Sequence, residues 1–108
     1  MSEWVQIHWS VGSLDEARRI ARRLVQDRLV ACAQMIPWIE SVYIWDQQLH
    51  TAQESLVFFK TRRALFEAVR ERIEKECVYE VPEILCLPLL DVNEKYRLWL
   101  ESQVVSST

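Results

Sequence analysis

Residues 31–60 read ACAQMIPWIESVYIWDQQLHTAQESLVFFK, and this stretch decides the fold. Its first half is rich in Ile, Val, Tyr and Trp, and its second half has the apolar run Leu56-Val57-Phe58-Phe59 at its centre. Because β-branched and aromatic side chains favour strands, we predict strands over 31–45 and 49–60, joined by a polar turn at 46–48. Together they form a β-hairpin with strands far longer than the usual five to six residues or so.

The residues before this hairpin predict a strand and then a helix. Apolar and polar residues alternate over 5–9, which is typical of a half-buried strand. Ser13 and Glu16 form a capping box, and apolar residues at helical spacing predict a helix over about 14–28.

The residues after the hairpin predict a helix, a short strand and a last helix. Thr61 is the expected cap of a helix that ends near Cys77, because Pro82 prevents a helical continuation from Val81. The continuous apolar run at 84–87 predicts a buried strand. Asn93 is the expected cap of the last helix, and one apolar stripe of this helix carries Tyr96, Trp99, Leu100 and Val104.

The predicted order is β-α-β-β-α-β followed by a further helix, so the fold class is α+β: a ferredoxin-like βαββαβ sandwich with an extra C-terminal helix. Right-handed crossovers place the first two helices on one face of an antiparallel sheet, and the last helix covers only part of the other face. Pro37 cannot donate to a strand ladder, so it predicts a bend, an interruption or an edge position in its strand. Long exposed strand edges are usually avoided, so a partner subunit is expected.

Length and charge narrow the classes of function. The 108 residues suffice for one domain, which we assign to 1–108. The net charge of -3 argues against a nucleic-acid or anionic-membrane partner. No apolar run has the length of a membrane span, and the first residues do not resemble a signal peptide, so we expect a cytoplasmic protein.

The residues that carry chemistry in most enzymes are sparse. Gly12 is the only glycine, which excludes a phosphate-binding or dinucleotide-binding loop of the usual kind, and no nucleophile motif occurs. The three cysteines lack the spacing of a disulfide framework or a standard zinc site. Paired carboxylates in residues 79–83 leave open a small hydrolase or isomerase that uses Glu80 or Glu83. A polar loop shaped by proline explains them more simply, so we predict no enzyme.

Five stretches in the expected order resemble the CutA family of divalent-ion tolerance proteins. The resemblance covers about residues 4–100 and is carried by residues 13–17 (SLDEA), 28–32 (RLVAC) leading into Ile36-Pro37, 41–45 (SVYIW) with 59–61 (FKT), 79–84 (YEVPEI), and Tyr96 with Trp99-Leu100. The resemblance implies a ferredoxin-like subunit in a cytoplasmic homotrimer similar to PII signalling proteins. It also implies a non-catalytic role in tolerance of divalent cations, notably copper, which some members bind.

The resemblance also implies two sets of site residues. Cys32 matches a copper-ligating cysteine of the family, and Cys77 stands in the region of the family's histidine, where a soft ligand suits Cu(I). No other cofactor is expected. Clefts between subunits are implied near five residues, Tyr43, Trp45, Lys60, Tyr79 and Glu83. A PII-like module that binds a small metabolite or anion in these clefts is the alternative function, and a plain Lys60–Glu83 salt bridge is the structural alternative.

Overall fold

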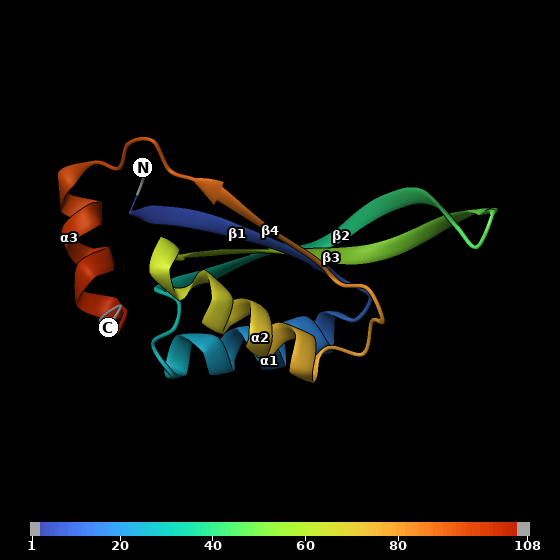
Figure 1. Cartoon of the computed structure of the whole chain (residues 1–108), viewed down its shortest axis with the longest axis horizontal. Coiled ribbons are helices and arrows are strands. Elements are labelled where there is room, and N and C mark those ends of the chain that lie inside the picture. The colour runs from blue at the N-terminus through green and yellow to red at the C-terminus, as the bar shows by residue number, and fades with distance from the viewer. Residues whose placement is uncertain (1–2, 106–108) are drawn as a thin grey trace.

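The computed structural model describes residues 3–105, and its sheet has the strand order β2-β3-β1-β4 with antiparallel neighbours (Figure 1). The elements are β1 (Trp4–Val11), α1 (Leu14–Gln26), β2 (Cys32–Trp45), β3 (Gln48–Arg62), the short 3-10 helix η1 (Arg63–Leu65), α2 (Phe66–Glu76), β4 (Glu83–Pro88) and α3 (Glu94–Gln103). This is the predicted α+β, ferredoxin-like βαββαβ sandwich with an extra C-terminal helix.

The core lies between one face of the sheet and helices α1 and α2, which run side by side across it (Figure 1). The strand side chains that alternate in the sequence all point into this core, and the apolar stripes of the two helices meet them. Its fully buried members include Val5, Ile7, Trp9, Val11, Ile20, Leu24, Val57, Phe59, Val69 and Ile73. The other face of the sheet is here called the open face, and no helix within residues 3–105 packs across it.

The sequence predicted that the last helix covers part of the open face. Helix α3 instead packs across one end of the sheet (Figure 1). Its Leu100 and the following Val104 join Trp4, Ala31 and Leu65 in a second apolar cluster. Trp99, expected on the buried stripe, remains 41% exposed. The open face is therefore even less covered by this chain than predicted.

Thr61 is not the cap of the second helix, and the chain shows why. It lies inside β3 opposite Val5, fully buried, and its hydroxyl donates to the carbonyl of Leu29 at 2.6 Å. The strand continues to Arg62, and α2 begins only at Phe66 after a 3-10 turn. A buried threonine with a backbone acceptor at hand has no free hydroxyl for capping.

The two ends of α1 also refine the prediction. The Ser13 hydroxyl accepts from the Glu16 N–H at 3.2 Å, so this half of the capping box is confirmed. Glu16 Oε1 is buried and has no hydrogen-bond partner within residues 3–105, so the reciprocal half is not observed. The helix ends at Gln26 and not at 28, because Arg28 turns into the left-handed region with φ 59°.

Pro37 sits at a β-bulge in the edge strand, so two of the three predicted alternatives hold together. Ile36 lies opposite Leu56 and Ile39 opposite Glu54, which leaves one extra residue in β2 at Pro37–Trp38. The carbonyl of Pro37 accepts from the Ser55 hydroxyl at 2.9 Å. An extra residue exchanges the two faces of the strand beyond it, so odd-numbered β2 residues face the open side after the bulge.

Beyond the bulge the hairpin leaves the sandwich as a two-stranded extension, here called the arm, which comprises residues 38–45 and 48–54 (Figure 1). Asp46 and Gln47 form its turn, both with positive φ (54° and 65°), which is the backbone of a two-residue type I′ hairpin. No helix within residues 3–105 is long and apolar enough to cross a membrane.

Candidate functional site

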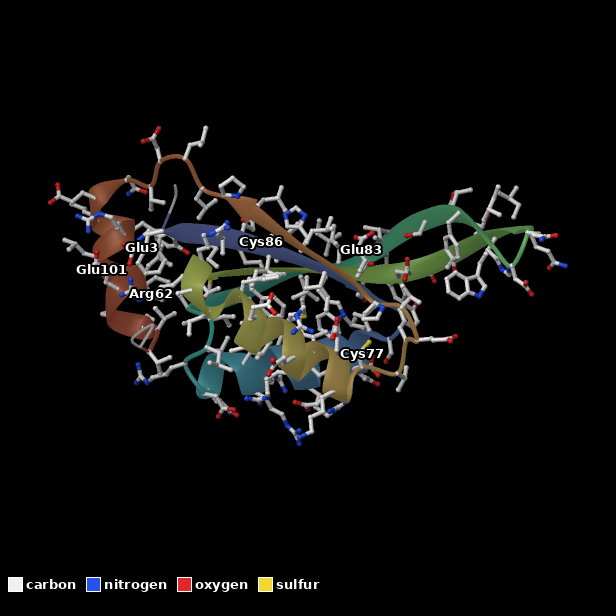
Figure 2. The ribbon with its side chains drawn as sticks, in the orientation of Figure 1. Glu3, Arg62, Cys77, Glu83, Cys86 and Glu101 are labelled. Carbon is white, nitrogen blue, oxygen red and sulfur yellow. The ribbon has the colours of Figure 1, made fainter. Side chains whose placement is uncertain are left out.

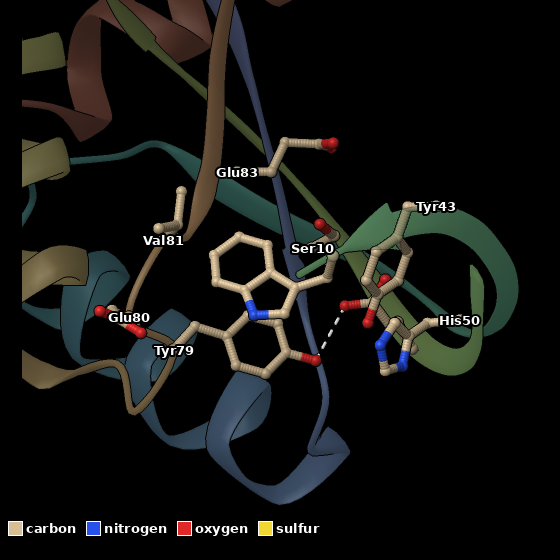
Figure 3. A pocket seen from close by; sticks show the side chains of 9 residues that line it. Ser10, Tyr43, His50, Tyr79, Glu80, Val81 and Glu83 are labelled. Carbon is tan, nitrogen blue, oxygen red and sulfur yellow. Dashed lines mark hydrogen bonds between the residues drawn. The ribbon is translucent and has the colours of Figure 1, made fainter. Parts of the chain in front are cut away.

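A cavity of about 380 Å³ lies where β1 ends and the arm continues alone. Its lining combines aromatic rings, carboxylates and a hydroxyl, contributed by Ser10, Tyr43, Trp45, His50, Glu54, Tyr79, Glu80, Val81 and Glu83 (Figure 3). These residues come from β1, both strands of the arm, the loop between α2 and β4, and the start of β4. A volume of this size is at the lower end of the range for small-molecule sites.

Glu54 and Tyr79 hold the arm against the loop after α2. Glu54 is the first residue of β3 beyond the pairing with β1, and it is only 7% exposed. The Tyr79 hydroxyl donates to Glu54 Oε2 at 2.9 Å (Figure 3). Burial, and then this bond to a carboxylate, raise the pKa of Tyr79 to about 12, so the phenol remains a donor at neutral pH.

Gly12 makes this contact between loop and strand possible. A Cβ at this position would lie 2.5 Å from the Tyr79 hydroxyl oxygen, closer than real Cβ contacts allow. The single glycine of the chain therefore leaves room for the phenol that donates to Glu54.

The bulge at Pro37–Trp38 brings the aromatic wall to the cavity. Tyr43 lies opposite His50, and their rings stack with centroids 5.7 Å apart. Without the extra residue, Tyr43 and Trp45 would project from the opposite face of the arm, away from Glu54. Both rings are partly exposed, Tyr43 by 42% and Trp45 by 49%, so they are accessible to a ligand or a partner subunit.

Of the five predicted cleft residues, the structure gathers four around the cavity: Tyr43, Trp45, Tyr79 and Glu83. Lys60 lies elsewhere, and its ammonium donates to Gln34 Oε1 at 2.7 Å. It pairs with Gln6, whereas Glu83 pairs with Ser10, about 13 Å further along β1 at the usual rise per residue. The proposed Lys60–Glu83 salt bridge is therefore not formed within the chain.

Sequence reasoning did not assign Ser10, His50 and Glu54 to this site. Ser10 and Glu54 lie on strands in which polar and apolar residues alternate, and polar residues in such strands are usually solvated. Only the pairing of the strands shows that both residues flank the cavity. The alternation of β3 puts His50 on the same face as Glu54, and the bulge in β2 then brings Tyr43 opposite His50.

The two predicted metal ligands lie at opposite ends of the sheet. Cys32 begins β2 and its Sγ is 3.5 Å from the hydroxyl of Tyr96 in α3, whereas Cys77 follows α2 beside Glu16, at the other end of the sandwich (Figure 2). Burial, chiefly, raises the pKa of the Cys77 thiol, and the Glu16 carboxylate raises it further, which disfavours a thiolate ligand. Within residues 3–105, no three His, Cys, Asp or Glu side chains are grouped so that they could hold a metal ion.

The architecture and the cavity define a ferredoxin-like α+β protein with a projecting arm and a ligand-sized hollow at its base. A sequence model of the family described as "CutA1 divalent ion tolerance protein" matches residues 5–103. The chain therefore belongs to the CutA1 divalent ion tolerance protein family.

Individual relatives agree with this assignment. The chain is 38% identical over 91 residues to the divalent-cation tolerance protein CutA of Thermus thermophilus, covering 84% of this chain and 88% of that protein. It is 33% identical over 103 residues to the chloroplastic protein CutA 1 of Oryza sativa, covering 95% of this chain and 58% of the relative. The crystal structure of CutA1 from Oryza sativa has a TM-score of 0.92 at 32% identity, over 96% of this chain and 95% of that one.

The relatives differ from this chain in length and among themselves in location. The chain spans 58% and 54% of the plant proteins from Oryza sativa and Arabidopsis thaliana, both named as chloroplastic. A structural neighbour from Archaeoglobus fulgidus is described as a periplasmic divalent cation tolerance protein. The predicted cytoplasmic location is therefore not confirmed by these relatives.

Proposed function

We propose that this chain is a non-catalytic subunit of a homotrimer that takes part in tolerance of divalent cations. One observation supports the assembly above all others: the arm carries large apolar side chains that no other part of residues 3–105 covers. Their exposed fractions are 64% for Trp38, 60% for Val42, 72% for Ile44, 49% for Trp45 and 72% for Leu49. Val42, Ile44 and Leu49 share one face of the arm, and Trp45 lies on the other. Exposed apolar side chains gathered on one element in this way mark a protein interface.

The two edges of the sheet are different surfaces, which favours a ring. The arm belongs to the β2 edge, and β4 forms the other edge. Contact between the arm of one copy and the β4 side of the next is head-to-tail, and such contacts close into a ring when the rotation permits. Leu85 and Leu87 of β4 are 49% and 39% exposed, so this side also offers apolar surface. We therefore assign three copies, as the family resemblance implies, with 1–108 as one domain of each in the cytoplasm.

Sedimentation equilibrium at micromolar concentration tests the assembly. The expected mass is three times the 12.9 kDa of the chain. A single species at the chain mass would contradict the proposal.

The residues described here do not fit a resident copper site within one chain, because Cys32 and Cys77 are far apart and no cluster of three ligands is present within residues 3–105. We propose that any Cu(I) affinity is weak and rests on Cys32. Titration with Cu(I) in competition with a chelator should show that Cys32→Ser removes most of the binding, with Cys86→Ser as the matched control. Equal binding by Cys32→Ser and the parent protein would remove Cys32 from the proposal.

The cavity supports a second candidate function, a PII-like module that binds a small metabolite or anion in clefts between subunits, here at the base of the arm. It is a hollow of ligand size whose walls combine aromatic rings with three carboxylates and a hydroxyl. Equilibrium dialysis against divalent metals and a metabolite panel separates the two candidates. Retention of a metabolite without a metal favours the module.

A further inference from the structure

The charges around the cavity all have one sign. Glu54, Glu80 and Glu83 line it, and none of the lysines and arginines in the described part of the chain does so. Lys60, the nearest expected cation, is held by Gln34 further along the sheet. A cavity with three carboxylates and no fixed cation repels an anion and attracts a cation.

The carboxylates are spread around the cavity and do not converge on one point. Glu54 comes from β3, Glu80 from the loop after α2, and Glu83 from the start of β4 (Figure 3). Within residues 3–105 they form no group, with His50 or with each other, that could hold a metal ion. The charge pattern therefore suits a cation larger than a chelated metal.

Aromatic rings supply most of the remaining wall. Tyr43, Trp45 and Tyr79 come from separate positions on the arm and the loop, and all three line the same cavity. The faces of tyrosine and tryptophan rings attract ammonium groups, and several rings around one space form the cage typical of such sites. Tyr79 is fixed there by its hydrogen bond to Glu54.

Ser10 adds a hydroxyl to the cavity wall. It is 7% exposed and lines the cavity from β1. An ammonium ligand has several N–H donors. The carboxylates can accept from some of them, and the Ser10 hydroxyl can accept from another.

We propose that this cavity binds a small organic cation, an ammonium group attached to an apolar body. The proposal rests on the second candidate function above and replaces the anion considered there with a cation. The carboxylates hold the charge, the rings of Tyr43 and Trp45 pack on the apolar body, and Ser10 accepts from an N–H.

A series of matched probes tests the sign of the charge. Benzylamine, benzyl alcohol and phenylacetate share one ring and differ mainly in charge, and benzyltrimethylammonium keeps the charge without N–H donors. Titrations of the ¹⁵N-labelled assembled protein, followed at the Trp45 indole N–H, should show that benzylamine binds at least about three-fold more tightly than benzyl alcohol. Phenylacetate should give no saturable shift.

Two variants and a control locate the site. Glu83 is exposed, so Glu83→Gln removes one charge without burying an unpaired group, and benzylamine binding should weaken by about three-fold or more. Ser10→Ala should weaken benzylamine but not benzyltrimethylammonium, because only the primary amine donates to the hydroxyl. Glu94→Gln, on α3 and away from the cavity, should bind like the parent protein.

Three results would overturn the proposal: phenylacetate binding as tightly as benzylamine, no amine-induced shifts in the assembled protein, or displacement of benzylamine by 1:1 addition of Zn²⁺. The last would show a metal site. The sedimentation experiment is separate, so a trimer without amine binding rejects the cation alone, and a monomer rejects the assembly alone.

Discussion

The two halves of the long hairpin have similar sequences and opposite surroundings. Where β3 pairs with β1, its inward residues Val57, Phe59 and Thr61 are fully buried beneath α1 and α2. In the arm, Val42, Ile44 and Leu49 are at least 60% exposed. The same β-branched and large apolar types occur in both halves, so residue type determines that each half is a strand but not what covers it.

The difference between the halves suggests where their stabilisation comes from. Burial of a large apolar side chain contributes about 1.5–3 kcal/mol, and the sandwich half obtains this within the chain. The arm obtains little of it until another surface covers it. The sandwich half therefore stabilises the subunit, and the arm is the part whose contribution depends on assembly.

A pair of truncations, one in each half of the hairpin, should show the largest difference between the two halves. Phe59→Ala removes a fully buried ring that stacks with Trp9 at 6.2 Å, and we expect a loss of about 3–5 kcal/mol in the free energy of unfolding. Ile44→Ala, in the arm, should cost the dissociated subunit less than about 1 kcal/mol, because this side chain is 72% exposed within the chain. Chemical denaturation of the dissociated subunit measures both, and equal losses would show that the two halves do not differ.

Trp45→Ala should have the next largest effect, on assembly and not on the subunit fold. A half-exposed tryptophan on the arm is the type of anchor whose loss weakens an interface by about 2 kcal/mol or more. Sedimentation equilibrium over a dilution series gives the change in association free energy. Trp99→Ala is the control, because Trp99 is similarly exposed on α3 but lies outside the arm; equal weakening by both variants would contradict a specific role of the arm.

The sandwich half was predictable from the sequence because its signals are local. Alternation over 5–9, helical spacing from residue 14 and the apolar run at 84–87 each identify an element, and the order of elements then defines the topology. Thr61 was misassigned because a strand end and a helix cap favour the same residue type. Its burial opposite Val5 is a tertiary effect.

The cavity was predictable only in part because it depends on register. Tyr79 and Glu83 belong to one short motif, so their proximity follows from the sequence, but Glu54 and Ser10 meet them only through strand pairing. The bulge then decides which face Tyr43 and Trp45 occupy. The distance between Lys60 and Glu83 within the chain depends on register in the same way, because Lys60 pairs with Gln6 and Glu83 with Ser10.

Tyr79→Phe tests how firmly the base of the arm is joined to the sandwich. It leaves the buried Glu54 carboxylate without this donor, and we expect a loss of about 1–2 kcal/mol at neutral pH. Thermal or chemical unfolding measures the loss, with Tyr43→Phe, at a partly exposed ring, as the control. A change no larger than that of the control would mean that the hydrogen bond contributes nothing to stability.

The same hydrogen bond predicts a dependence on alkaline pH. The pKa of Tyr79 is about 12 in the folded protein, against about 10 for an unfolded chain. Between these values the folded state binds more protons, so its stability is complete below about pH 10 and falls as pH rises towards 12. The decrease in stability with rising pH should be shallower in Tyr79→Phe. Part of the decrease should remain, because the pKa of Tyr96 is also raised to about 12.

Gln47→Gly should have the smallest effect, and it sharpens the comparison because it acts at the far end of the arm. A type I′ turn requires positive φ at both central residues, and Gln47 adopts φ 65° with a side chain that disfavours it. Glycine removes this strain, so the arm should gain about 0.5–1 kcal/mol of local stability. Amide hydrogen exchange should show slower opening at residues 42–52, with little change in the global free energy of unfolding, because an arm outside the sandwich can open while the core remains folded. A rise in global stability as large as the local one would instead show that the arm and the sandwich unfold as one unit.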